Sequence, residues 1–303
     1  WVNGATNTEL ATLAEAMEGA SVNIGYKLDN ASYDSVSCSV GGQEGSPRGM
    51  AFNADGTKMF VCGSVGDDVN EYILSTAFDI STATYSQVFS VSAQDTTPQD
   101  IAFNADGTKM FVLGEAGKDV NEYALSTGFD VSTASFTQAS ASVSSKENYP
   151  AGLAFNNDGT KMYITGETAP QSIHQYSLST GFDVSSITFT ASFSIASQDI
   201  RPTGIAFNSN GSKIFVVGNI SDSVYEYALS TEFDVSTASY IQNFSIASQD
   251  STPQAVVFNS DGFKMYVVGD TNNSIFQYSV VGADYTNQMD KTQLDAVTDP
   301  NHI

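Results

Sequence analysis

The chain has 303 residues, of which 41% are hydrophobic, enough to build a substantial core. Its 34 acidic residues outnumber 11 basic ones, and the resulting net charge of −23 repels nucleic acid and anionic membrane surfaces. No apolar run approaches the roughly 18 residues of a transmembrane helix, so we expect no nucleic-acid partner and no membrane span.

The polar residues are mostly uncharged, because charged residues make up only 15% of the chain. Together with 24 glycines, this composition indicates an all-β protein that is extracellular or carried on a virion surface. Cys38 and Cys62 form no metal-binding motif, and we expect two buried free thiols. The chain begins with Trp1 and no signal peptide follows, so we expect a processed product or a fragment of a longer array.

The first predicted element is a short helix over residues 7–18. Leu10, Leu13 and Met17 lie on one face of that helix, and Gly19 ends it. Residues 1–25 are therefore expected to form an N-terminal helical segment ahead of the main domain.

A repeat of about 51 residues follows. The phrase Ala-Phe-Asn-Ala-Asp-Gly-Thr-Lys-Met-Phe-Val occupies residues 51–61. Its phenylalanine is Phe52, and the matching residues are Phe103, Phe155, Phe207 and Phe258, at intervals of 51, 52, 52 and 51 residues. A period near 50 is typical of a propeller blade, so the repeat predicts five blades.

Each repeat predicts four strands. The Ala-Phe-Asn run is the first strand, and an Asn-x-Asp-Gly turn, in which glycine supplies left-handed backbone, leads to the Lys-Met-Phe-Val strand. A third strand centres on a recurrent tyrosine, and a Leu-Ser-Thr-x-Phe-Asp linker precedes a fourth, alternating strand. We interpret the Asp-Gly turns and the Phe-Asp linkers as structural features and not as calcium sites.

The fifth repeat lacks its fourth strand, because its pattern stops after the third strand at residues 280–281. An unpaired copy stands near the N-terminus, where residues 28–33 resemble residues 233–240. We therefore expect residues 33–40 to complete blade 5 beside residues 274–280, which closes the ring and removes an open sheet edge.

These patterns predict an all-β fold: a five-bladed β-propeller with four strands per blade over residues 26–281. One extra residue occurs at residues 33–40 and again near residues 139–143, and each should form a β-bulge. Residues 282–303 are expected to form a C-terminal helical linker, with a short helix over residues 286–297.

The Ala-Phe-Asn-x-Asp-Gly-Thr-Lys-Met-Phe-Val repeat resembles the propeller repeats of the YVTN and lactonase-like superfamily. With Asp-Val-Asn-Glu-Tyr and Leu-Ser-Thr-x-Phe-Asp-Val-Ser-Thr-Ala added, it looks similar to repeats in structural or tail-associated proteins of marine bacteriophages. The resemblance covers roughly residues 28–281. It implies a virion or secreted surface protein, and it carries no catalytic motif.

The sequence argues against an enzyme. Enzymes of this superfamily place metal-binding or acidic residues in the central channel, but this chain has two histidines, His174 and His302, and the second lies in the tail. Glycoside cleavage needs two carboxylates about 5–10 Å apart, and among the entries of the five inner strands only Asp100 is acidic. We therefore expect no catalytic residue, no metal and no cofactor.

The loops that differ most between repeats lie on one propeller face, where we expect a ligand. Arginine and tyrosine there suit an acidic polysaccharide, although an equally good interpretation is that the arginines only neutralise nearby acids such as Glu44 and Asp199. The candidate ligand-binding residues are Arg48, Asp100, Lys146, Glu147, Tyr149, Glu167, Gln171, His174 and Arg201.

The function expected from the sequence is that of a non-catalytic structural or binding module of a virion or an extracellular fibre. Its partners would be a polysaccharide or protein of a host surface, together with neighbouring modules of a longer chain. Two alternatives stay open: a lectin with repeated sugar sites, and a lactonase-like or glycosidase-like enzyme with a central site.

Overall fold

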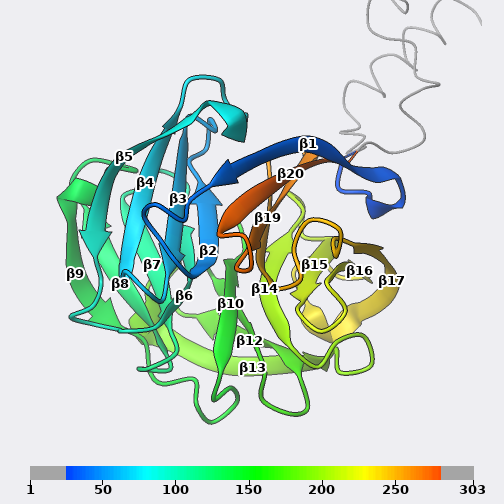
Figure 1. Cartoon of the computed structure of the whole chain (residues 1–303). Coiled ribbons are helices and arrows are strands. Elements are labelled where there is room, and N and C mark those ends of the chain that lie inside the picture. Colours follow the sequence, from blue (N-terminus) through cyan, green and yellow to red (C-terminus); the bar gives the residue numbers. More distant parts are fainter. Residues whose placement is uncertain (1–24, 281–303) are drawn as a thin grey trace, which may run out of the picture.

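The computed structural model describes residues 25–280, which form five four-stranded antiparallel sheets arranged as propeller blades around a central axis (Figure 1). The predicted five-bladed, all-β fold is confirmed. The helical elements among the described residues are five short 3-10 turns, which start at Leu28, Ile80, Val131, Val184 and Val235. The helices predicted over residues 7–18 and 286–297, with the segment bounds around them, lie outside the described residues. Within residues 25–280 no helix is long and apolar enough to cross a membrane.

Each blade runs from an inner strand on the axis to an outer strand on the rim. The inner strands are β2 (Pro47–Phe52), β6 (Pro98–Phe103), β10 (Pro150–Phe155), β14 (Pro202–Phe207) and β18 (Pro253–Phe258). The second strands are β3 (Lys58–Gly63), β7 (Lys109–Gly114), β11 (Lys161–Gly166), β15 (Lys213–Gly218) and β19 (Lys264–Gly269). The third strands are β4 (Asp68–Leu74), β8 (Asp119–Leu125), β12 (Ser172–Leu178), β16 (Ser223–Leu229) and β20 (Ser274–Val280). The outer strands are β5 (Ala83–Ser90), β9 (Ala134–Ala139), β13 (Ile187–Ser194), β17 (Ala238–Ser245) and β1 (Ala31–Ser39).

Blade 5 is closed by the N-terminal strand, as the repeat predicts. Strand β1 lies antiparallel to β20, with Tyr33 opposite Tyr278 (Figure 1). The expected bulge is present, because the pairing moves from Tyr33 to Val36 while the partner advances by one residue. Each of the other four outer strands also bulges beside the recurrent tyrosine, which the sequence pattern alone did not predict.

Aromatic residues of the third-to-fourth-strand linkers cover the Asp-Gly turns. Gly107 has φ +70°, and a Cβ there would lie 2.2 Å from the ring of Phe129, which is itself left-handed at φ 57°. The arrangement recurs in all five blades. In blade 5 the covering ring belongs to Tyr26, which therefore extends the N-terminal closure beyond β1.

The hydrophobic core lies between neighbouring blades. Phe60 and Cys62 of blade 1 pack against Ile101 and Met110 of blade 2, and equivalent clusters fill the other interfaces. The prediction of two buried thiols is right for Cys62 and wrong for Cys38, which is only half-buried because it lies on an outer strand. Both thiols are free.

Candidate functional site

The five inner strands meet at a narrow waist of the central channel. The third residues of these strands form it: Gly49, Asp100, Gly152, Gly204 and Ala255. The strands approach so closely that a Cβ on Gly204 would lie 2.7 Å from the Cα of Ala255, and one on Gly49 would lie 2.5 Å from the Cα of Asp100. Small residues are therefore required at most of these positions, and Asp100 is the exception.

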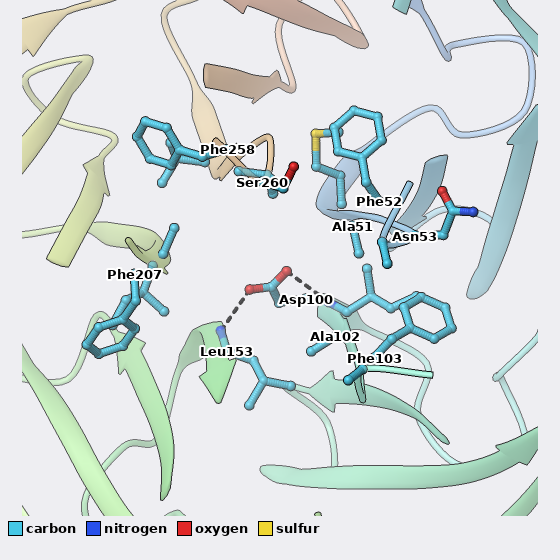
Figure 2. A pocket seen from close by; sticks show the side chains of 18 of the residues that line it. Ala51, Phe52, Asn53, Asp100, Ala102, Phe103, Leu153, Phe207, Phe258 and Ser260 are labelled. Carbon is cyan, nitrogen blue, oxygen red and sulfur yellow. Dashed lines mark hydrogen bonds between the residues drawn. The ribbon is translucent and has the colours of Figure 1, made fainter. Parts of the chain in front are cut away.

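One side of the waist opens into a cavity of about 380 Å³, which we call the apolar chamber. Phe52, Phe103, Phe207 and Phe258 line it with alanines and branched aliphatic residues, and Asp100 projects into it at the waist (Figure 2). The Asp100 carboxyl accepts hydrogen bonds from the backbone N–H groups of Ile101 and Leu153, at 2.8 and 2.7 Å. Burial raises its pKa to about 8, despite those two bonds.

The other side of the waist opens into a cavity of about 230 Å³, which we call the polar chamber. It is lined by Arg48, Gln99, Glu115, Tyr149, Pro150, Ala151, Glu167, Arg201, Thr203 and Gln254. Most of these residues come from two recurrent positions. One is the second residue of an inner strand and the other is the residue that follows the glycine at the end of a second strand. The chamber is therefore built by the same fold positions in successive blades.

The charges of the polar chamber are partly paired. Arg201 makes a forked contact with Glu167, with Nε and Nη2 lying 3.1 and 2.9 Å from one carboxylate oxygen. Arg48 is held less closely, because its Nη1 lies 3.5 Å from Asp270. Glu115 accepts a 2.9 Å hydrogen bond from the neutral amide of Gln99. The chamber thus contains one fixed arginine, one loosely held arginine and a carboxylate with no cation among its described partners.

The structure brings four of the nine predicted ligand-binding residues together. Arg48, Tyr149, Glu167 and Arg201 all line the polar chamber. Asp100, which was expected at the same mouth of the channel, lies on the opposite side of the waist because its carboxyl turns toward the N–H of Leu153.

Two more of the nine, Glu147 and Lys146, make contacts outside the polar chamber. Glu147 is fully buried and accepts hydrogen bonds from the backbone of Tyr149 and Thr168, so that it ties two loops together. Glu44, Asp95, Asp199 and Asp250 make the corresponding contacts in the other blades. Lys146 lies over the ring of Phe189, with Nζ 4.0 Å from its centroid.

Gln171 and His174 also lie outside the chamber lining. Gln171 donates to the backbone oxygen of Glu167. His174 contacts Ser192 through Nδ1 at 2.9 Å, and burial together with the nearby charge of Lys146 lowers its pKa to about 4. At neutral pH this imidazole is uncharged.

The sequence pattern did not single out Glu115, whereas Glu167 was among the predicted ligand-binding residues. Both residues follow the glycine that ends a second strand, so they lie outside the inner strands, where acidic residues were expected. The repeat does indicate this position, because the residue after the glycine is polar in every blade and acidic in three of them. In successive blades it is Ser64, Glu115, Glu167, Asn219 and Asp270. In residues 25–280 no group of three histidine, cysteine or acidic residues is placed to hold a metal ion.

The family model of the lactonase β-propellers, described as seven-bladed, matches residues 52–236. The chain belongs to this lactonase family. Within it the chain is a compact variant, because β1 closes the ring after five blades. No curated protein matches the chain.

Solved structures are similar to the chain at low sequence identity. A functionally unknown protein from Desulfotomaculum acetoxidans is 14% identical over 74% of this chain and 62% of its own, with a TM-score of 0.46. A Bacteroides uniformis protein provisionally assigned as a 6-phosphogluconolactonase is 14% identical over 73% and 63%, with a TM-score of 0.45. A luciferin-regenerating enzyme is 12% identical over 82% and 95%, with a TM-score of 0.48. The chain thus spans less than two thirds of the first two structures, and likeness at this level carries no argument about activity.

The family match corrects the function expected from composition and repeats. The expectations of a non-catalytic virion or fibre module and of no enzymatic activity are contradicted, because the matched family is one of lactonases. The lactonase-like part of the resemblance is confirmed, whereas nothing supports the likeness to bacteriophage virion proteins.

Proposed function

We propose that the chain hydrolyses lactones and that the polar chamber is its active site. The observation that carries this proposal is the presence of Glu115, Glu167, Arg48 and Arg201 in the lining of one cavity at the channel mouth. Membership of the lactonase family supports the reaction class.

Opening a lactone requires a base that activates water and a positive group that stabilises the oxyanion formed on the carbonyl oxygen. Glu115 is the proposed base, since the described partner of its carboxylate is the neutral amide of Gln99, while Lys118 Nζ donates to its backbone oxygen. Arg48 is the proposed oxyanion stabiliser, because its weak contact with Asp270 leaves guanidinium N–H groups free to donate. Proton transfer from water to Glu115 accompanies attack on the carbonyl, and the ring oxygen leaves as the alcohol after the proton returns.

The apolar chamber is a poorer candidate for this reaction. It offers one carboxyl group, Asp100, and the two N–H groups that face it already donate to its own oxygens. No arginine, lysine or histidine is among the described residues that line it. Water activation there would lack a cationic side chain to stabilise the oxyanion.

The lining of the polar chamber also indicates the kind of lactone. Two arginines and two glutamates sum to zero charge, and both arginines already contact carboxylates. A neutral, hydroxylated lactone suits such alternating donors and acceptors better than a phosphorylated one. Tyr149, which is exposed at the rim, offers a ring face to the substrate.

The test measures acid release from γ- and δ-lactones, with aryl esters and aryl glycosides for comparison. The wild type should hydrolyse at least one lactone class. Glu115→Gln should lower the rate by about 10²–10⁴-fold, and the exposed Glu232→Gln should not change it. Turnover of glycosides alone would replace lactone hydrolysis by glycoside cleavage, a reaction that needs two carboxylates, and the polar chamber contains Glu115 and Glu167. Equal lactone turnover by Glu115→Gln would refute the assignment of the base.

The other expectations from the sequence stay predictions. An extracellular location suits the acidic, serine- and threonine-rich surface, and a polysaccharide that supplies or presents the substrate fits the variable loops around the polar chamber. Localisation of the full-length protein and a glycan array are the measurements that test them.

A further inference from the structure

The apolar chamber contains an acidic residue, Asp100, that the fold does not require. The position of Asp100 at the waist is occupied by glycine in three other blades and by alanine in the fourth, so the blade architecture forms without a carboxyl group there. Asp100 fits because Gly49 beside it lacks a Cβ, which would lie 2.5 Å from Asp100 Oδ1. A carboxyl at this position costs stability and is therefore expected to serve a ligand.

The carboxyl is held in place but lacks a counter-charge. Asp100 is 5% exposed, and its oxygens accept from the N–H groups of Ile101 and Leu153. In the part of the chain that the structure describes, no arginine, lysine or histidine forms an ion pair with it. A carboxylate accepts about four hydrogen bonds, so both oxygens keep capacity for a donor that enters the chamber.

The rest of the lining selects the body of such a ligand. Phe52, Phe103, Phe207 and Phe258 belong to the lining, with their rings turned away from Asp100 toward aromatic rings of neighbouring blades (Figure 2). Alanines and aliphatic side chains form most of the remaining wall, together with the polar Asn53, Asn104 and Ser260. The aliphatic part of this wall suits an apolar group, because apolar surface that is removed from water on binding stabilises the complex. An anionic ligand is disfavoured by Asp100 and by the net charge of −23.

We propose that the apolar chamber is a binding site for a hydrophobic amine, whose ammonium group pairs with the Asp100 carboxylate while its apolar body packs against the aliphatic side chains of the lining. The site lies on the opposite side of the waist from the polar chamber. It is therefore independent of the proposed hydrolysis, and either assignment can fail without the other.

Titration calorimetry with benzylamine and benzyl alcohol tests the proposal, because the two probes share a shape and differ in charge. The wild type should bind the amine at least about tenfold more tightly than the alcohol. Asp100→Asn should remove that preference, whereas the exposed Glu232→Gln should keep it. Equal affinity for both probes, a preference that survives in Asp100→Asn, or no binding of benzylamine would overturn the proposal.

A second measurement needs no variant. Because burial holds the pKa of Asp100 near 8, its carboxyl is mostly protonated at pH 7, and pairing with an ammonium group should release close to one proton. Calorimetry in buffers with different ionisation enthalpies measures this number. Binding of benzylamine without proton release would place the amine elsewhere and overturn the proposal.

Discussion

Replacing Asp100 by asparagine should reverse the order of stability between acidic and alkaline pH. The carboxyl of Asp100 has a pKa of 3.8 in an unfolded chain and about 8 in the folded protein. Between these values the folded state holds the additional proton, so the free energy of unfolding falls as the pH rises from about 4 to about 8. The asparagine side chain does not titrate, and this component of the pH dependence disappears in the variant.

The size of the effect follows from the same shift. From pH 5 to pH 8 the ionisation of Asp100 lowers the stability of the wild type by up to roughly 4 kcal/mol, at about 1.36 kcal/mol per pH unit. At pH 5 the wild type should be the more stable protein. The N–H groups of Ile101 and Leu153 donate to the two Asp100 oxygens, and in the variant one of them would face the asparagine NH₂ group, which cannot accept, at a cost of about 1–3 kcal/mol. The variant should therefore be less stable at pH 5 and more stable at pH 9.

Urea unfolding of both proteins at pH 5, 7 and 9, followed by circular dichroism, measures the difference directly. Other carboxyl groups titrate in both proteins and cancel in the comparison. A difference in unfolding free energy that stays constant from pH 5 to pH 9 would show that Asp100 is ionised in the fold throughout, and the account of its burial would be wrong.

Three further predictions concern the scaffold. Gly107→Ala should lower the free energy of unfolding by roughly 2–4 kcal/mol, because alanine is strained in left-handed backbone and its Cβ would clash with the ring of Phe129. Gly42→Ala, with open space around the added Cβ, should leave the stability unchanged, and equal melting temperatures of the two variants would contradict this account. Deletion of residues 1–40 should leave blade 5 open and the protein aggregated, and a soluble truncation that melts cooperatively would count against closure by β1. Under native conditions a thiol reagent should modify Cys38 well before Cys62, and simultaneous modification would argue against the burial described for the latter.

Much of the fold could be predicted from the sequence, because its determinants recur locally. The glycine of each Asp-Gly turn has the left-handed φ that the turn demands, and the copy near Tyr33 pairs with β20 as its spacing indicates. The sequence did not indicate that Tyr26 covers the turn at Gly262. Tyr26 stands where the other four linkers have phenylalanine, and it precedes residues 28–33, the copy that the repeat pattern identified.

The candidate site was predicted less completely, because it depends on how five strands meet. Arg48 and Arg201 stood out by their rarity in an acidic chain, and both line the polar chamber. Glu115 did not stand out among the 34 acidic residues, and only the ring geometry brings it to the same cavity. That Asp100 faces the opposite chamber follows from its hydrogen bond to Leu153, a residue 53 positions away in the sequence.

The most direct test of the central claim is a crystal structure of the Glu115→Gln variant soaked with a δ-lactone. The proposal predicts the lactone in the polar chamber, with its carbonyl oxygen within hydrogen-bond distance of the Arg48 guanidinium and a water beside residue 115. A lactone bound in the apolar chamber against Asp100, or a polar chamber that stays empty at saturating lactone, would contradict it.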